Sequence, residues 1–272
     1  MADKALRFSL GIQAAKSLTA LQDKVKRYED IGFDALHLPD HLGAPAPFPV
    51  LTAIASATSR VRLGTYVLNA GFYKPALLAR DAGEVNQLSG GRLELGLGTG
   101  YVREEFEAAE LPYPTARQRV DYLEHVTTYL KKHLPEVPIL IAGNGNRLLT
   151  IAARQADIIG LTGAGSGDAA DPLAERIEFV RDAAGDRFAD LELNLAITAV
   201  PSGDSEQPDL ALIRRFVQLS DDQLLALPSV LGGSPSGIAD TLRGYREKYG
   251  LTSFTFQENH VDTIAKVIAE LH

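Results

Sequence analysis

The chain has 272 residues, of which 45% are hydrophobic and 23% charged, and it contains no cysteine. These values are typical of a folded globular protein and exclude disulfides, thiolate catalysis and cysteine-based metal sites. The net charge of −8 argues against nucleic-acid and anionic-membrane partners, and no apolar run reaches the roughly 18 residues that span a bilayer.

Eight short β-forming runs recur along the chain, with helix-like segments between them. In the segment Leu18–Ile31, apolar residues stand three or four positions apart, which is the spacing of one apolar helix face. The same spacing recurs at Leu123, Val126 and Leu130. The expected strands are residues 8–12, 35–39, 62–69, 92–96, 138–142, 158–161, 193–199 and 253–257.

Helix start and stop signals agree with this alternation. Pro75 and Pro235 suit first helical turns, and Gly32, Gly90 and Gly250 stand where helices should stop. Alternating strands and helices predict a parallel sheet. Eight units favour a closed (β/α)8 TIM barrel, an α/β fold, over an open doubly wound sheet, which stays an alternative. No linker interrupts the pattern, so we expect one domain over residues 1–272.

Three of the expected strand-to-helix links are long, namely residues 98–117, 162–171 and 200–209. In a TIM barrel these links form the face that carries the active site. The second and third links are rich in glycine, serine and aspartate. They fit either a lid that orders on ligand binding or plain surface loops.

The densest polar cluster follows the second expected strand, in the sequence LHLPDHL. An imidazole beside a carboxylate can transfer a proton or bind a ring carbonyl, so Asp40 and His41 are candidates for catalysis. We expect His37 to point into packing. A weaker alternative is a metal site shared by His37, His41 and His260, although no HExxH motif or paired-aspartate ladder supports it.

Glycine-rich turns end three neighbouring strands, in the sequences LELGLGTG, ILIAGNGNR and DIIGLTGAG. The first is not a Rossmann fingerprint, because Arg103 occupies the place of its third glycine. Three such turns side by side indicate a phosphate-bearing cofactor lying across the end of the barrel. No GxSxG elbow or P-loop is present, which argues against the commonest acyl- and phosphoryl-transfer mechanisms. Redox chemistry carried by a bound cofactor remains as a possible activity.

The stretch TSRVRLGTYVLNAGFYKPALLARDAGEVNQLSGGRLELGLGTGYVREEF resembles the core of the luciferase-like monooxygenase superfamily, especially its F420-dependent oxidoreductases. LHLPDH, PILIAGNGNRLLTIAARQAD and GSPSGIADTLRGYREKYGLTSFTF resemble further segments of that family, so the similarity covers most of the chain. Residues 164–229 match least, and we expect substrate choice there. The resemblance implies hydride transfer between F420, at the C-terminal face of the barrel, and a small organic substrate.

The same resemblance implies roles for individual residues. Asp40 and His41 would meet the ring system, with His41 as the catalytic residue, and the Tyr66 to Val67 peptide bond would be a non-proline cis bond behind the ring. Gly98, Thr99 and Gly100 would line the ring edge or the tail of the cofactor. Ala142, Gly143, Thr162 and Gly163 would lie nearer its phosphate end. The implied cofactor-binding residues are Asp40, His41, Tyr66, Val67, Gly98, Thr99, Gly100, Ala142, Gly143, Thr162 and Gly163.

One departure from the family pattern matters. F420-dependent glucose-6-phosphate dehydrogenases carry a catalytic glutamate just after the GTG turn, where this chain has Tyr101, so we expect no glucose-6-phosphate activity. The GTYVL segment favours F420 over FMN. An FMN-dependent monooxygenase, a metal-dependent hydrolase and a non-catalytic cofactor-binding barrel stay as alternatives. We expect a cytoplasmic homodimer whose only other partner is its small-molecule substrate.

Overall fold

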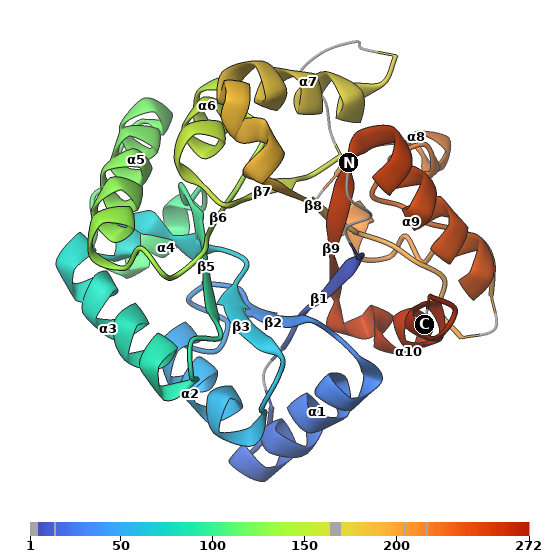
Figure 1. Ribbon diagram of the computed structural model, residues 1–272, viewed down its shortest axis with the longest axis horizontal. Helices are drawn as coiled ribbons and strands as arrows, with labels where there is room; N and C mark the ends of the chain where they lie inside the picture. The colour runs from blue at the N-terminus through green and yellow to red at the C-terminus, as the bar shows by residue number, and fades with distance from the viewer. Residues whose placement is uncertain (1–4, 14, 164–169, 204, 216, 272) are drawn as a thin grey trace.

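The computed structural model describes residues 5–13, 15–163, 170–203, 205–215 and 217–271. Its strands form one parallel sheet in the order β3-β2-β1-β9-β8-β7-β6-β5-β4, and a further pairing of β3 with β5 closes the sheet into a barrel (Figure 1). The strands are β1 (Arg7–Gly11), β2 (Ala35–Leu38), β3 (Arg62–Thr65), β4 (Leu68–Asn69), β5 (Leu93–Gly98), β6 (Ile139–Ala142), β7 (Ile158–Leu161), β8 (Glu192–Ala196) and β9 (Leu251–Gln257).

Helices surround the barrel as an outer ring (Figure 1). The α-helices are α1 (Leu18–Ile31), α2 (Pro47–Ala57), α3 (Pro75–Leu88), α4 (Arg103–Ala108), α5 (Ala116–His133), α6 (Asn146–Gln155), α7 (Pro172–Ala184), α8 (Asp221–Leu225), α9 (Pro235–Tyr249) and α10 (Val261–Ala269). Short 3₁₀ turns are η1 (Ala70–Phe72), η2 (Gly185–Asp190), η3 (Ile213–Arg215) and η4 (Glu258–His260). The TIM-barrel prediction is therefore confirmed, and the open-sheet alternative is wrong.

One expected strand is split in two. Residues 62–69 form β3 and β4, with Tyr66 and Val67 between them outside the ladder, and the peptide bond joining these two residues is cis, as the resemblance implied. β3 and β4 occupy one of the eight barrel positions, since both pair with β5. β5 accordingly runs two residues beyond its expected end, because Gly98 pairs with Asn69.

The expected strand over residues 193–199 is shorter in the structure. β8 ends at Ala196 because the chain leaves the ladder and turns toward a second partner segment: the Thr198 N–H donates to the Ser229 carbonyl at 2.8 Å, and Ala199 forms a parallel bridge with Val230. The segment between these bridge partners contains η3 and α8 and has a small hydrophobic cluster of its own. Of the link over residues 162–171, residues 164–169 lie outside the described part of the chain.

Helix termini follow the expected signals. Ser17 caps α1 by accepting the Ala20 N–H at 3.2 Å, and Gly32 ends the same helix with φ +104°, in the left-handed region that glycine tolerates. Pro235 stands in the first turn of α9. The expected apolar stripe of α1 is wrong at its first member, because Leu18 is 59% exposed.

Strand residues point alternately outward to the helices and inward to the barrel axis. The outward side chains build the hydrophobic core; among them, the rings of Phe8 and Phe256 stack 5.9 Å apart. The buried inward side chains include polar ones, such as Ser9, Asn194 and Thr255. The interior of this barrel is therefore polar, and its sheet-to-helix layer is apolar.

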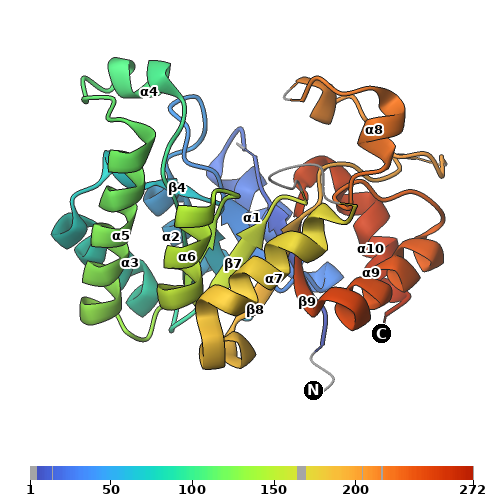
Figure 2. The same ribbon diagram turned by 90° about the horizontal axis from the view of Figure 1, so that it is seen from above.

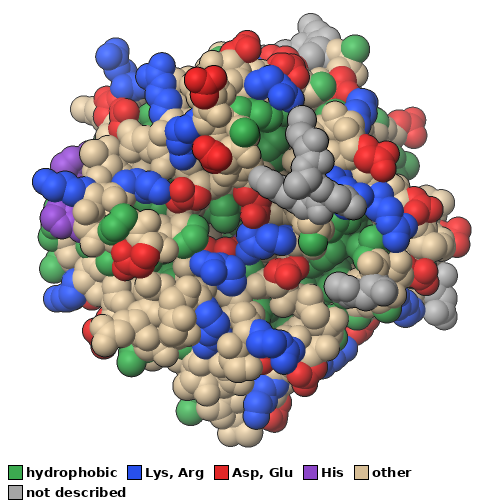
Figure 3. Space-filling view, in the orientation of Figure 1, with side chains coloured by type: hydrophobic (Ala, Val, Ile, Leu, Met, Phe, Trp, Pro, Cys, Tyr) green, Lys and Arg blue, Asp and Glu red, His purple; other side chains and the backbone are tan. Residues whose placement is uncertain are grey.

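The two ends of the barrel differ. Figure 2 shows α4 and α8 beyond the same end, which is the end where β5 runs into α4. On the face drawn in Figure 3, basic and acidic side chains are intermixed, so this face offers no extended basic area to a polyanion. Within the described segments, no helix is long and apolar enough to span a membrane.

Candidate functional site

The carboxyl ends of β2 and β5 bring His41 beside α4. His41 Nδ1 lies 2.9 Å from the Oε1 atom of Glu105, and the imidazole is 44% exposed. The ring of Tyr101 meets the imidazole edge-on, with centroids 6.4 Å apart. The candidate catalytic histidine is thus open to solvent on one side and bonded to a carboxylate on the other.

Asp40, the carboxylate next to His41 in sequence, has other partners. Its Oδ2 atom accepts the Asn69 N–H at 2.9 Å, and the Tyr73 hydroxyl donates to the same carboxylate. Burial raises the pKa of Asp40, although these two hydrogen bonds and the nearby His41 oppose the rise. Asp40 therefore ties the end of β2 to the segment after the cis bond, and it is Glu105 that contacts His41.

The glycines at the end of β5 make room for the interruption between β3 and β4. A Cβ atom on Gly96 would lie 2.0 Å from the Thr65 carbonyl oxygen, and one on Gly98 would lie 2.6 Å from Cγ2 of Val67. The Thr65 hydroxyl also donates to the Gly96 carbonyl at 2.8 Å. The sequence pattern predicts room for a ligand beside these glycines, whereas the atoms nearest to them belong to Thr65 and Val67. The segments with the sequences GTYVLN and GLGTG therefore pack directly against each other, and each depends on the shape of the other.

A Gly96→Ala variant should therefore be strongly destabilised. Because the atom that its Cβ would meet is backbone, one of two paired strands must shift, and we expect the free energy of unfolding to fall by about 3 kcal/mol. Denaturant unfolding measures this. The matched control is Gly244→Ala inside α9, where no atom lies within 4 Å and alanine should raise stability by about 0.5–1 kcal/mol. Equal stability of the Gly96→Ala and wild-type proteins would contradict this direct packing.

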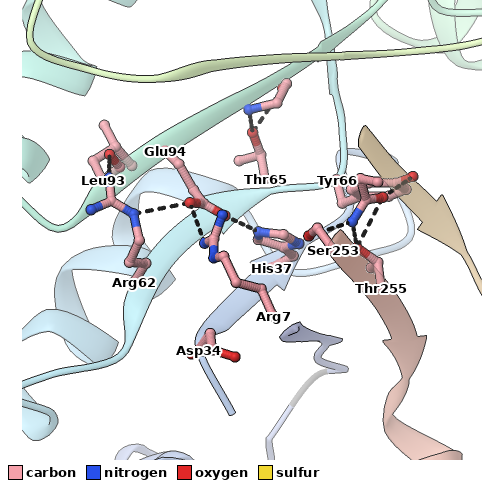
Figure 4. Close-up of polar contacts among 12 residues, drawn as sticks. Arg7, Asp34, His37, Arg62, Thr65, Tyr66, Leu93, Glu94, Ser253 and Thr255 are labelled. Carbon is pink, nitrogen blue, oxygen red and sulfur yellow. Dashed lines mark hydrogen bonds and ion pairs between the residues drawn. The ribbon is translucent and has the colours of Figure 1, made fainter. Parts of the chain in front are cut away.

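Tyr66 reaches across the barrel interior. Its hydroxyl donates to Oδ1 of Asn194 at 3.1 Å, and its ring stacks on that of His37 with centroids 5.8 Å apart (Figure 4). Gly160 on β7 leaves space for it, since a Cβ there would lie 3.0 Å from the tyrosine oxygen. Burial raises the pKa of the Tyr66 hydroxyl, which keeps it a neutral hydrogen-bond donor.

His37 is buried, as expected, and its partners are polar. Its Nε2 atom lies 2.8 Å from Glu94 Oε1, and the same carboxylate accepts from Arg7 at 3.0 Å and Arg62 at 2.9 Å (Figure 4). Burial alone would raise the pKa of Glu94, but the His37 hydrogen bond and the two arginine charges hold it at about 2. This cluster fixes the middle and the N-terminal end of the barrel interior, below Tyr66.

The three histidines of the metal alternative do not meet. His37 is bonded to Glu94 and His41 to Glu105, while Nδ1 of His260 accepts the Gln257 N–H at 3.4 Å. Burial lowers the pKa of His260 to about 4. Within the part of the chain that the structure describes, no group of three or more histidine, aspartate or glutamate side chains could hold a metal ion. The described residues therefore offer no site to a metal-dependent hydrolase.

The turns after β6 and β7 lie together. The Gly143 N–H donates to the Gly160 carbonyl at 3.2 Å, which brings Ala142 and Gly143 beside the strand that leads to Thr162 and Gly163. Gly143 has φ +153° and Gly163 φ +75°, so both turns use conformations that favour glycine. The four residues expected at the phosphate end are thus brought to one place.

A buried arginine that the sequence interpretation missed stands at the same place. Arg176, in the first turns of α7, is 3% exposed; it donates to Oδ1 of Asn146 at 2.6 Å and forms an ion pair with Glu175 through Nη2, and its Nε makes no hydrogen bond to any described residue. Asn146 begins α6, and no side chain caps that helix. An uncapped helix N-terminus beside a guanidinium is suited to a phosphate group. The residues present therefore fit a phosphate-bearing cofactor.

Comparison with known proteins gives consistent results. A family model described as luciferase-like monooxygenase matches residues 6–223. The chain is 33% identical over 135 residues to an F420-dependent glucose-6-phosphate dehydrogenase of Intrasporangium calvum, which covers 46% of this chain and 40% of that protein. It is 31% identical over 157 residues to a 5,10-methylenetetrahydromethanopterin reductase of Archaeoglobus fulgidus, covering 50% and 47% of the two chains. The chain thus spans less than half the length of either relative.

Among solved structures, the F420-dependent tetrahydromethanopterin reductase of Methanopyrus kandleri superposes with a TM-score of 0.74. The alignment covers 98% of this chain and 97% of the other, with 17% sequence identity. Identity this low supports a shared fold and nothing finer.

Proposed function

Since the chain belongs to the luciferase-like monooxygenase family, we propose that it is an oxidoreductase that transfers a hydride between F420 and a small organic substrate. The observation that carries the proposal is the arrangement at the C-terminal face of the barrel. There, an exposed imidazole bonded to a carboxylate shares one barrel end with glycine turns and a buried guanidinium that suit an anionic tail.

In this proposal the cofactor lies between two groups of residues. Arg176, the α6 N-terminus and the turns at Gly143 and Gly163 hold the phosphate end. The ring end rests against Tyr66 and Val67 and near Gly98 to Gly100, with Asp40 and His41 on the substrate side. F420, when bound, supplies or accepts the hydride; the protein supplies position and electrostatics.

His41 is the group that moves the proton. Hydride transfer to or from a carbon that bears oxygen changes the proton affinity of that oxygen, so a base or acid is needed within hydrogen-bond reach. His41 has one ring nitrogen on Glu105, and its Nε2 makes no hydrogen bond within the described residues. The imidazole is exposed enough for a substrate to reach Nε2.

Titration of the apoprotein with F420 and with FMN, followed by fluorescence quenching, tests the cofactor. We expect micromolar or tighter binding of F420 and weaker binding of FMN. The absence of binding by either compound would reject the proposal. Tighter binding of FMN would favour the FMN-dependent monooxygenase, and F420 binding without turnover on a broad substrate panel would favour the non-catalytic barrel.

An Arg176→Met variant should bind F420 about tenfold more weakly or worse. Methionine fills much of the same volume but removes a charge-assisted hydrogen-bond donor from a buried site, where such a bond to phosphate is strong. Isothermal titration calorimetry measures the change. Arg181→Met is the matched control, because Arg181 stands on the same helix and is paired with Glu178 at the surface. Equal losses in the two variants would contradict a role for Arg176 at the phosphate.

The substrate is not glucose 6-phosphate in this proposal, because Tyr101 stands where such dehydrogenases carry the catalytic glutamate. The segment from Ala199 to Val230 and the α4 region flank the site and are the parts that select the substrate (Figure 2). The homodimer and the cytoplasmic location stay predictions, and light scattering would give the oligomeric mass.

A further inference from the structure

We propose that Glu105 is the positioning residue of the site: it holds the imidazole of His41 as the Nδ1–H tautomer, so that Nε2 is the atom that takes the substrate's proton. This inference rests on the proposed function, in which His41 moves that proton. The sequence alone favours Asp40 for this task, because Asp40 adjoins His41. The structure engages Asp40 elsewhere and brings in Glu105 from 64 residues away.

The contact itself is a short, well-formed hydrogen bond. The 2.9 Å between His41 Nδ1 and Glu105 Oε1 is the usual length of an N–H···O bond. An ionised carboxylate only accepts, so the neutral imidazole must carry its proton on Nδ1 to make the bond. The side chain of Glu105 is 18% exposed, so water screens this bond only in part.

Glu105 is held in place by the residue that follows it. Phe106 is buried and packs its ring against Phe72 and Tyr113, with centroids 5.3 and 5.2 Å away. Gly71 provides the room, since a Cβ there would lie 2.7 Å from the Phe106 ring. Because α4 is only six residues long, the buried Phe106 holds the helix in place and with it the direction of the glutamate.

Asp40 is excluded from the same task by its own bonds. Its carboxylate accepts from the Asn69 backbone and from Tyr73, so it ties the chain after β2 to the end of β4 and to the residue that follows η1. A move toward His41 would leave the Asn69 N–H without its acceptor in a buried region, which is costly. The carboxylate that sets the tautomer is therefore the distant one.

The tautomer decides which atom does the chemistry. With Nδ1 protonated, Nε2 carries the lone pair and can accept a proton. With an alcohol as substrate, Nε2 would take the proton of the O–H group and the O–H electron pair would form the carbonyl; F420, when bound, would supply the acceptor for the hydride lost from carbon. Glu105 keeps its hydrogen bond to the Nδ1–H group throughout and stabilises the imidazolium that forms. In the reverse direction Nε2 returns the proton to the oxygen.

Nuclear magnetic resonance of the full chain labelled with ¹⁵N-histidine tests the proposal without any ligand. Long-range ¹⁵N–¹H correlations of the neutral imidazole give the ratio of the two tautomers, and a His41→Asn variant identifies the His41 signals among those of the six histidines. We expect wild-type His41 to be mainly the Nδ1–H form. In Glu105→Ala the ratio should move toward Nε2–H by about tenfold or more, the effect of one hydrogen bond to a charged group.

Glu104→Ala is the matched control, since it removes an exposed carboxylate from the preceding position of α4. It should keep the wild-type ratio. Glu105→Gln, which keeps an oxygen acceptor but no charge, should give an intermediate ratio. A wild-type tautomer ratio in Glu105→Ala would overturn the proposal. F420 affinity, measured on the same samples, separates the two ideas: a wild-type protein that binds no F420 rejects the proposed function, whereas the tautomer ratio reports on Glu105 alone.

Discussion

A His41→Ala variant will turn over its substrate about 10²–10⁴-fold more slowly than the wild type, which is the usual contribution of a positioned acid or base. Its affinity for F420 should change little, because in the proposed site the phosphate end is held by Arg176 and the glycine turns. A large loss in kcat with an almost unchanged Kd for F420 is the signature of a residue that acts on the reacting oxygen. Glu105→Ala should lose part of the same activity, since it leaves the imidazole in place but unoriented.

The rates are measured from the absorbance change of F420 with the best substrate found in a panel that includes secondary alcohols. His125→Ala is the control, because His125 is exposed on the outer helix α5, where its ring lies 5.9 Å from that of Tyr122. It should keep wild-type rates. If His41→Ala also keeps them, another group moves the proton and the assignment of His41 is wrong.

A Glu94→Ala variant will lower the free energy of unfolding by about 3–5 kcal/mol, because removing one partner of a buried ion pair leaves the other charges uncompensated. Glu94 is 3% exposed and binds His37, Arg7 and Arg62 at once. Chemical denaturation measures the loss. Glu107→Ala is the control, since that glutamate is 62% exposed in a loose pair on α4 and should change stability by less than about 0.5 kcal/mol. Similar losses in both variants would contradict the central role of Glu94.

The same carboxylate makes stability depend on pH. Its pKa is lowered from 4.5 to about 2 in the folded chain, so the unfolded chain binds more protons between these values. The stabilisation from Glu94 is therefore complete above pH 4.5 and is lost as the pH falls toward 2. Unfolding free energies of the wild type should drop over this window more steeply than those of Glu94→Gln, which has no carboxylate to titrate. Parallel profiles would show that other groups dominate.

The barrel could be predicted from the sequence because its signals are local. β-forming runs, prolines in first turns and glycines at helix ends each lie within a few residues, and Pro235 and Gly250 bound α9 as expected. The split of residues 62–69 was less accessible to strand patterns. It depends on the room that Gly96 and Gly98 leave, and these glycines lie about 30 residues further along the chain. A pattern read from one short stretch of sequence cannot contain both partners of this contact.

Some residues of the candidate site could be predicted from the sequence and others could not, again because only local signals can be recognised in it. His41 and the glycine turns could be found because they directly follow strands. Glu105 and Arg176 were missed because each stands on a helix among other charged residues, and only the folded chain distinguishes them from surface charges. Phe106, the buried residue beside Glu105, was the available signal that α4 is anchored and that its carboxylates have fixed directions.

The segment between Ala199 and Val230 leaves and rejoins the barrel at one point. Its two ends form a parallel bridge, and the Leu231 N–H donates to the Ala199 carbonyl at 2.9 Å. Its apolar side chains, such as Ile213 and Leu224, pack mainly with one another. Because the two ends of this segment are adjacent and it has its own hydrophobic cluster, it can be lengthened, shortened or replaced without a change in the pairing register of any barrel strand. Exchange of this segment would therefore change what stands over the barrel end and leave the strands and the proposed site beneath it unaltered.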